Sequence, residues 1–330
     1  MNRQFRKIII DGNNIFYKCY FVALSILERS KKPYTSKQVY SEAVSIFLSS
    51  VTKLQREVAF IDSEFYFLWD NPTSKKKLQQ SMDSSLLKRK ELDPEYKNNR
   101  VQKDKSFYHV INYLRLLLSY KSSRYYDLQI EMMEADDLLS SLLNYFKSID
   151  QYKDILIVSE DLDWSRGIDI ENNILWYAKK KVYDAKEFHK KYRFYPTKER
   201  IIMYKTFRGD NSDNIPNAVK NLKEDVLLEI IEQYKDIYTF LQYYETDDYI
   251  SPKMKEKVKN NRHRLRLNYQ LVEFIDIDIS VVKSNLIQGE KNETKLIKLC
   301  QSLDILTKEF KKQKVTANNF LRKRSKFKRD

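Results

Sequence analysis

The sequence predicts an α/β fold with a central, mostly parallel sheet flanked by helices, followed by a smaller C-terminal helical domain. Up to about residue 190, short β-rich runs alternate with helical stretches, as they do in α/β folds. Acidic residues follow directly after several of these runs. Beyond about residue 195 strand patterns fade and helical periodicity dominates. A chain of 330 residues is long enough for one large and one smaller domain.

The expected strands are short runs of apolar and β-branched residues, at 7–10, 65–69, 155–158 and 174–177. The expected helices show apolar residues at three- and four-residue spacing, at 37–57, 106–120, 134–147 and 225–231. We therefore place a catalytic α/β domain at 1–192 and a helical domain at 193–305.

Two segments are strongly basic. The segment 72–105 has few large apolar residues and much positive charge, and it is too long for an ordinary connection. A lid, a binding loop, a solvated loop and disorder are the open interpretations. A basic tail is expected at 306–330, where the last twenty residues carry nine Lys or Arg and one Asp.

Acidic residues stand where the expected strands end. Asp11 follows the first strand, Asp70 the second, and Asp161 and Asp163 the third. Ligands of open α/β sheets bind beyond the carboxyl ends of the strands, so one fold can bring these carboxylates together. Two unit charges about 4 Å apart repel by roughly 4 kcal/mol at an effective dielectric near 20. The cluster therefore predicts bound cations.

The expected ligands are all oxygen atoms. The three histidines and two cysteines lie outside the acidic motifs. Such a ligand set suits Mg²⁺ or Mn²⁺ and disfavours a catalytic zinc site. Further acids occur in the runs 134–137 and 210–213. Taken alone, the first run has an ordinary explanation as acids in the first turn of a helix, and the second as loop and cap residues.

The overall charge has the opposite sign. The formal net charge is +15, from 61 Lys and Arg against 46 Asp and Glu. A basic surface neutralises phosphates with salt-sensitive affinity, so a nucleic-acid partner is expected. The cysteine spacing implies no disulfide framework, and no stretch is long and apolar enough for a membrane span. We expect a soluble, cytoplasmic monomer without a membrane partner.

Five ordered motifs between about residues 5 and 220 resemble the 5′-nuclease (flap endonuclease) family, most closely its phage ribonuclease H and phage 5′-exonuclease members. They are Asp11-Gly12-Asn13-Asn14, Trp69-Asp70, Glu134-Ala135-Asp136-Asp137, Ser159-Glu160-Asp161-Leu162-Asp163-Trp164 and Gly209-Asp210-Asn211-Ser212-Asp213-Asn214-Ile215-Pro216. Each motif alone is weak, and the five together are specific. The resemblance implies a PIN-like 5′-nuclease fold with a helical arch.

The resemblance also implies two Mg²⁺ ions, with Mn²⁺ as a substitute. The residues around the first metal would be Asp11, Asp70, Glu134, Asp136, Asp161 and Asp163. Those of a second, more loosely held metal would be Asp137, Asp210 and Asp213.

The remaining implied roles concern the substrate. Lys97 and Arg100 match the arch motif that reaches the scissile phosphate, and Lys205 matches a substrate-contacting lysine. The arch would be the segment 72–105, and a helix–hairpin–helix-like element would lie at about 205–235. The nucleic-acid contacts that we expect are Tyr96, Lys88, Arg89, Lys220 and Lys223.

The implied activity is Mg²⁺-dependent 5′–3′ exonuclease and flap endonuclease cleavage of DNA or RNA–DNA hybrid, with RNA primer removal in phage-type replication. The basic tail is a candidate site for DNA, a single-strand-binding protein or a sliding clamp. The alternatives are a non-catalytic nucleic-acid-binding scaffold, a PIN-type ribonuclease and a phosphatase of the haloacid-dehalogenase type. That phosphatase needs an Asp at the position of Asn13.

Two departures from the family pattern are visible. The stretch 217–223 has no glycine where family members have a Gly-rich hairpin, so its contact with duplex backbone must differ. Leu162 stands where a glycine is common. Neither change removes an expected ligand, so we expect an active enzyme.

Overall fold

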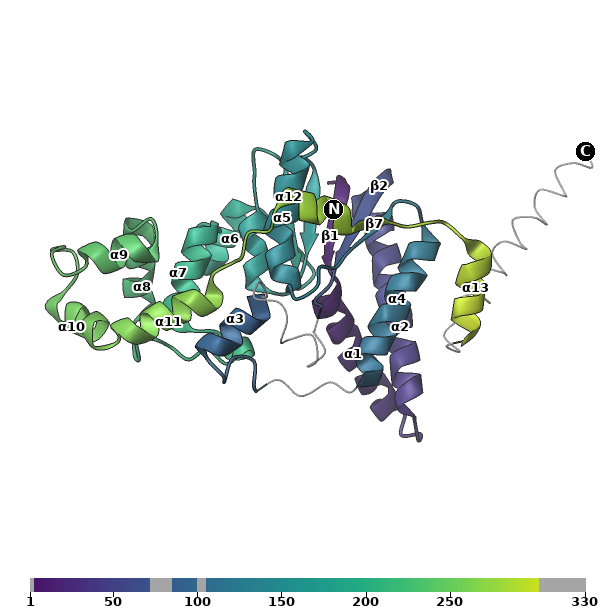
Figure 1. Ribbon diagram of the computed structural model, residues 1–330, viewed down its shortest axis with the longest axis horizontal. Coiled ribbons are helices and arrows are strands. Elements are labelled where there is room, and N and C mark those ends of the chain that lie inside the picture. The colour runs from purple at the N-terminus through teal and green to yellow at the C-terminus, as the bar shows by residue number, and fades with distance from the viewer. Residues whose placement is uncertain (1–2, 72–84, 100–104, 303–330) are drawn as a thin grey trace, which may run out of the picture.

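The computed structural model describes residues 3–71, 85–99 and 105–302. These residues form a seven-stranded sheet in the order β6-β5-β4-β1-β2-β3-β7, flanked by helices (Figure 1). Its strands are β1 Phe5–Asp11, β2 Ala59–Leu68, β3 Tyr125–Leu128, β4 Ile155–Val158, β5 Ile174–Ala178, β6 Lys181–Tyr183 and β7 Leu286–Gln288. Strands β1 to β5 pair in parallel, and the edge strands β6 and β7 pair antiparallel. The predicted α/β fold with a mostly parallel sheet is confirmed.

The first strand supplies side chains to both faces of the sheet. Ile8 and Ile10 pack in a core with α1 Gly12–Arg29, α2 Ser36–Val58 and α4 Lys105–Lys121. Ile9 lies between them in the sequence and packs on the opposite face, against α5 Ala135–Ser148. This alternation is the normal consequence of the two-residue period of a strand. A run of three isoleucines therefore joins the two cores at the centre of the sheet.

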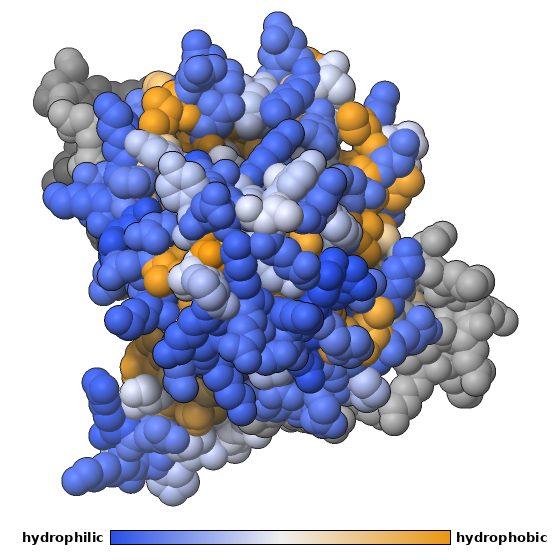
Figure 2. Space-filling view, turned by 90° about the vertical axis from the view of Figure 1, so that its left-hand side faces the viewer, coloured by the Kyte–Doolittle hydropathy of each residue, from blue (hydrophilic) through white to orange (hydrophobic). Residues whose placement is uncertain are grey.

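A helical lobe extends from one end of the sheet (Figure 1). Its helices are α6 Ala185–Tyr192, α7 Lys198–Arg208, α8 Glu224–Gln233, α9 Ile237–Tyr243, α10 Pro252–Asn260 and α11 Arg262–Val272. The end of this lobe presents a mostly hydrophilic surface with scattered apolar side chains (Figure 2). Within the described ranges, no helix combines the length and apolarity needed to cross a bilayer.

The chain then returns to the sheet. After α11 it forms α12 Ile279–Asn285, which packs against α5, then β7 beside β3, and then α13 Glu293–Ser302 against α4. The sequence pattern led us to expect only helices between 193 and 305, so β7 is an addition to that expectation. Three residues, Leu286 to Gln288, are too few to show a strand period. The division into domains remains a prediction.

The order of the strands determines where a site can form. Strand β1 lies between β2 and β4, and all three run in the same direction. The chain runs from β1 to β2 and β3 on one side and then crosses to β4 on the other, so the strand order reverses at β1 and a crevice opens at its carboxyl end. Asp11, Asp70 and Asp161 stand at that end of the sheet or just beyond it. The helix α3 Ser85–Leu92 belongs to the predicted arch segment, of which residues 72–84 and 100–104 lie outside the described residues.

Candidate active site

A cavity of about 410 Å³ opens at the carboxyl edge of the sheet. Four of the predicted metal ligands line it, together with a lysine of the segment 72–105: Asp11, Asp70, Asp136, Asp161 and Lys97. Its other lining residues are polar or aromatic: Asn13, Asn14, Tyr17, Asn99 and Ser212. The structure thus brings together carboxylates that are up to 150 residues apart in the sequence.

Backbone and side-chain hydrogen bonds fix the first two carboxylates. Asp11 caps α1, and its Oδ1 accepts from the N–H of Asn14 at 3.0 Å while its Oδ2 accepts from the Ser159 hydroxyl at 2.8 Å. The N–H of Asp70 donates to Asn13 Oδ1 at 3.1 Å, and the Asp70 Oδ1 accepts from the N–H of Ala135 at 2.8 Å. These bonds tie the ends of β1, β2 and β4 to the start of α5.

Asp136, Asp161 and Asp163 form the tightest acidic group among the described residues. Each offers a carboxylate oxygen within 4.8 Å of the others. Asp161 caps the short helix η1 Leu162–Gly167 by accepting from the N–H of Asp163 at 3.0 Å. Trp164 is fully buried, and its indole N–H donates to Asp136 Oδ1 at 2.5 Å. Three convergent oxygen donors at this spacing fit a hard divalent cation.

Burial and mutual repulsion raise the pKa values of these carboxyl groups. Burial raises the pKa of Asp11 to about 8, and the charges of Asp70 and Asp161 add to the shift. Burial raises the pKa of Asp163 to about 6, with Lys205 opposing the shift and Asp161 adding to it. Burial and the charges of Asp161 and Asp163 raise the pKa of Asp136 well above its usual range. A divalent cation would relieve this repulsion, so the electrostatics also fit a metal site.

Lys205 connects the group of Asp136, Asp161 and Asp163 with the acidic turn that carries Asp210 and Asp213. Its ammonium lies 2.6 Å from Asp163 and 2.7 Å from Asp210, and the side chain is buried. Burial alone would raise the pKa of Asp210, but Lys205 and the two hydrogen bonds from Ser212 bring that pKa down to about 2. Asp213 accepts from the Tyr96 hydroxyl at 3.1 Å and lies 3.5 Å from Lys97 Nζ. Whether Asp210 and Asp213 bind a second metal remains a prediction.

Gly209 sets the course of the turn that carries Asp210. Its backbone has φ 69° and ψ −170°, a conformation that is open almost only to glycine, and a Cβ there would lie 2.2 Å from the carbonyl oxygen of Ile215. We expect Gly209→Ala to lower the free energy of unfolding by about 2 kcal/mol or more, because strain and overlap add. Urea denaturation measures the loss. Asn211→Ala, exposed in the same turn, is the control, and equal midpoints for the two variants would contradict this account.

Two predicted nucleic-acid contacts face the protein interior. Tyr96 is 2% exposed and packs with Ile215 and Leu271. Arg89 is 6% exposed and pairs with Glu134 and with Asp137, at 3.2 Å from the latter. Both side chains are thus buried and bonded to protein carboxylates in this structure. Their contact with nucleic acid stays a prediction.

The other predicted contacts lie as follows. Lys97 has φ 57°, pairs with Glu134, and donates its N–H to the Asp213 carbonyl at 2.8 Å. Lys88, Lys220 and Lys223 are exposed. Arg100 lies outside the described residues.

Asp137 does not line the cavity. It is fully buried, and its Oδ1 accepts from the N–H of Ile275 at 3.0 Å and from Arg89 at 3.2 Å.

Two partners of the site were not predicted from the sequence, namely the hydroxyl of Ser159 and the guanidinium of Arg166. Ser159 opens a recognised motif and could have been found there, whereas no pattern marks Arg166.

Comparison with known proteins identifies the family of the chain. The family model described as "5′-3′ exonuclease, N-terminal resolvase-like domain" matches residues 6–193, more than half of the chain. The chain belongs to this family. Our sequence-based assignment to the 5′-nucleases is thereby confirmed.

Individual relatives are distant. A 5′-3′ exonuclease of Buchnera aphidicola is 25% identical over 283 residues, covering 84% of this chain and 90% of the relative. DNA polymerase I of Bacillus subtilis is 24% identical over 314 residues, covering 93% of this chain. The chain spans about a third of the length of the DNA polymerase I relatives, 32% in this case and in that of Caldicellulosiruptor bescii.

Solved structures show the same fold. A bacteriophage T5 protein co-crystallised with metal ions superposes with a TM-score of 0.57 at 18% identity, covering 91% of this chain and 99% of that one. A flap endonuclease of the same phage, in a pseudo-enzyme–product complex with DNA and metal ions, gives a TM-score of 0.56 at 17% identity, with coverage of 91% and 98%. This family fold is thus one in which metal ions and DNA have been observed.

Proposed function

We propose that the protein is a divalent-metal-dependent nuclease that hydrolyses phosphodiester bonds near the 5′ ends of DNA or RNA–DNA hybrid duplexes, including 5′ flaps. The observation that carries this proposal is the convergence of Asp136, Asp161 and Asp163 within 4.8 Å, beside a cavity that Asp11 and Asp70 also line. The family and the metal-bound and DNA-bound relatives support it.

The carboxylates hold the metal in this proposal. Mg²⁺, or Mn²⁺ in its place, would activate the attacking water and stabilise the charge of an in-line displacement at phosphorus when bound. Asp136, Asp161 and Asp163 supply the central ligands, and Asp11, Asp70 and Glu134 surround them. A hard, oxygen-only ligand set favours these ions over zinc.

The cations of the chain have separate roles. Lys97 stands at the cavity beside the carboxylates, where its ammonium can hold charge on a non-bridging phosphate oxygen. Lys205 keeps Asp163 and Asp210 in place. Arg100 stays a proposed phosphate contact. The exposed Lys88, Lys220 and Lys223 would meet the backbone of the substrate outside the cavity.

The finer proposal concerns the biological substrate. The likeness of the motifs to phage ribonuclease H and 5′-exonuclease members supports RNA primer removal in phage-type replication, with the protein acting as a monomer in the cytoplasm. A single-strand-binding protein and a sliding clamp are proposed partners. Reconstituted primer removal with each partner added in turn tests this part separately.

Metal removal tests the proposal directly. With a 5′-labelled flap, a nicked duplex and an RNA–DNA hybrid, we expect cleavage in Mg²⁺ or Mn²⁺ and none in EDTA, because no protein group replaces the ion. The restored rate on adding back Mg²⁺ is the control for irreversible damage. Cleavage of unstructured single-stranded RNA alone would favour the PIN-type ribonuclease, and tight binding without cleavage in any metal would favour the scaffold.

A further inference from the structure

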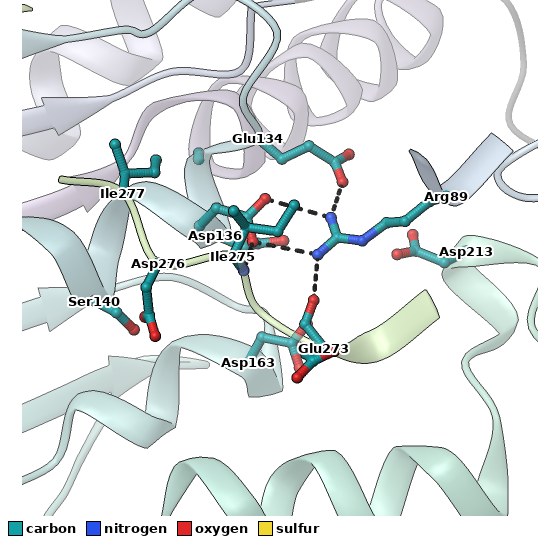
Figure 3. Close-up of polar contacts among 12 residues, drawn as sticks. Arg89, Glu134, Asp136, Ser140, Asp163, Asp213, Glu273, Ile275, Asp276 and Ile277 are labelled. Carbon is teal, nitrogen blue, oxygen red and sulfur yellow. Dashed lines mark hydrogen bonds and ion pairs between the residues drawn. The ribbon is translucent and has the colours of Figure 1, made fainter. Parts of the chain in front are cut away.

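The segment 273–277, here called the return segment, leads from α11 of the helical lobe back to α12 beside the sheet. It runs past the start of α5, where Figure 3 shows Arg89 between Glu134 and the Glu273 carbonyl. That carbonyl accepts from Arg89 at 2.7 Å, and the N–H of Ile275 donates to Asp137 at 3.0 Å. Main-chain groups of the return segment are thus bonded to both α3 and α5.

A second arginine connects the return segment to the metal ligands. Arg166 lies in η1, three residues after Asp163, and its guanidinium carbon is 3.4 Å from the centre of the Phe274 ring. Phe274 is 6% exposed. Such close stacking of a cation on a ring is favourable and restricts the plane of the guanidinium. The return segment therefore contributes to the orientation of Arg166.

The hydrogen bonds of Arg166 join the two elements that carry the acidic group. One nitrogen donates to the main-chain oxygen of Asp163 at 2.7 Å, and another donates to the main-chain oxygen of Asp136. The third, Nε, donates to the hydroxyl of Ser140 at 3.1 Å, one turn further along α5. A single planar group thus fixes η1 against the first turn of α5.

The choice of acceptors matters for metal binding. Lys205 pairs with the carboxylate of Asp163, whereas Arg166 donates to main-chain oxygens beside the acidic group. Its positive charge offsets part of the repulsion among the acids and leaves their oxygens directed at the site. The planar guanidinium of arginine donates to two carbonyl oxygens and a hydroxyl at once. The ammonium group of a lysine could not make the same three hydrogen bonds in this geometry.

We propose that Arg166, oriented by Phe274, is a positioning residue that sets the spacing of Asp136 and Asp163 and thereby the affinity of the site for divalent cations. Asp137 and Arg89 anchor the same return segment. The inference rests on the proposed function, since it assigns the acidic group to metal binding.

The test measures Mn²⁺ affinity by electron paramagnetic resonance of the free ion, in the absence of substrate. Partners of metal ligands commonly change affinity by 10–100-fold, so we expect Arg166→Met and Arg166→Lys to bind Mn²⁺ at least about tenfold more weakly. Phe274→Leu should weaken it in the same direction. Arg200→Met is the matched control, because Arg200 pairs with Glu232 at 2.7 Å and lies over the Tyr195 ring, on the outside of the lobe.

Cleavage as a function of Mg²⁺ supplies the second readout. The Arg166 variants should need more Mg²⁺ for half-maximal rate while the rate at saturating Mg²⁺ stays within about threefold of the wild type. A merely structural role would lower the rate without changing the Mg²⁺ requirement.

The outcomes separate the two proposals. Unchanged Mn²⁺ affinity in Arg166→Lys and Phe274→Leu would overturn the inference, and so would a lower saturating rate at unchanged affinity. If Arg166→Met does not fold, as judged by circular dichroism, the other two variants decide. Failure of the wild type to cleave any substrate would count against the proposed function, and the Mn²⁺ titration would still judge the role of Arg166.

Discussion

Asp161→Ala is expected to lower the single-turnover rate of flap cleavage by about 10³-fold or more, because loss of a metal ligand removes several kcal/mol of charge stabilisation. Asp161 is the acid best placed to have this effect. It belongs to the group of three close carboxylates, lines the cavity and caps η1. Affinity for the flap in Ca²⁺ should stay within about threefold, since basic groups elsewhere supply most phosphate contacts.

Quenched-flow cleavage of a 5′-labelled flap and fluorescence anisotropy measure the two quantities. Asp184→Ala is the matched control: Asp184 caps α6 by accepting from the N–H of Glu187 at 2.8 Å, outside the cavity. Asp161→Asn adds a second comparison. Its amide oxygen can still accept the capping hydrogen bond from the N–H of Asp163, but the negative charge that binds the metal is lost. Undiminished cutting by Asp161→Ala would remove the metal assignment.

The next largest effect is expected for Lys97→Ala. Lys97 is the one described cation that lines the cavity, and it stands between Glu134 and Asp213. Its ammonium would act on charge that develops during cleavage, and loss of such a donor commonly costs 10²–10³ in rate. We therefore expect a rate loss of about 10²-fold with a change in flap affinity below about threefold.

Lys88→Ala is the comparison for Lys97→Ala. Lys88 is exposed on α3 and should contact phosphate without entering the cavity. The Lys88→Ala substitution should weaken flap binding and reduce the slope of log affinity against log salt concentration by about 1, as expected for one lost phosphate contact. The single-turnover rate should change little. If Lys97→Ala lost affinity and rate in equal proportion, Lys97 would be a binding residue and its assigned role in the chemical step would be wrong.

The sheet and the cluster of carboxylates at its carboxyl edge were predictable, because short stretches of neighbouring residues in the sequence indicate both. The runs 8–10, 65–69 and 155–158 are apolar or aromatic, as is typical of strands covered on both faces, and Asp11, Asp70 and Asp161 follow within three residues. The direction of parallel strands then brings these carboxylates to one edge. Nothing beyond strand order is needed for that prediction.

The burial of Arg89 was not predictable in the same way. Arg89 stands in a basic stretch, and its neighbours Lys88 and Lys90 are exposed as the stretch suggests. Its burial depends on Glu134, Asp137 and the Glu273 carbonyl, which lie 45 to 184 residues away. The roles of Arg166 and Phe274 likewise come from a contact between distant segments, which no spacing in the sequence reveals.

The antiparallel pairing of β7 with β3 has a practical consequence for shortened versions of the protein. A variant cut after α11 would retain the acidic residues but would leave the main-chain edge of β3 uncovered, together with the surfaces of α4 and α5 that α13 and α12 occupy. Open strand edges promote association between molecules. Such a fragment should precipitate on concentration, whereas one that ends at residue 302 keeps the edge of β3 paired with β7.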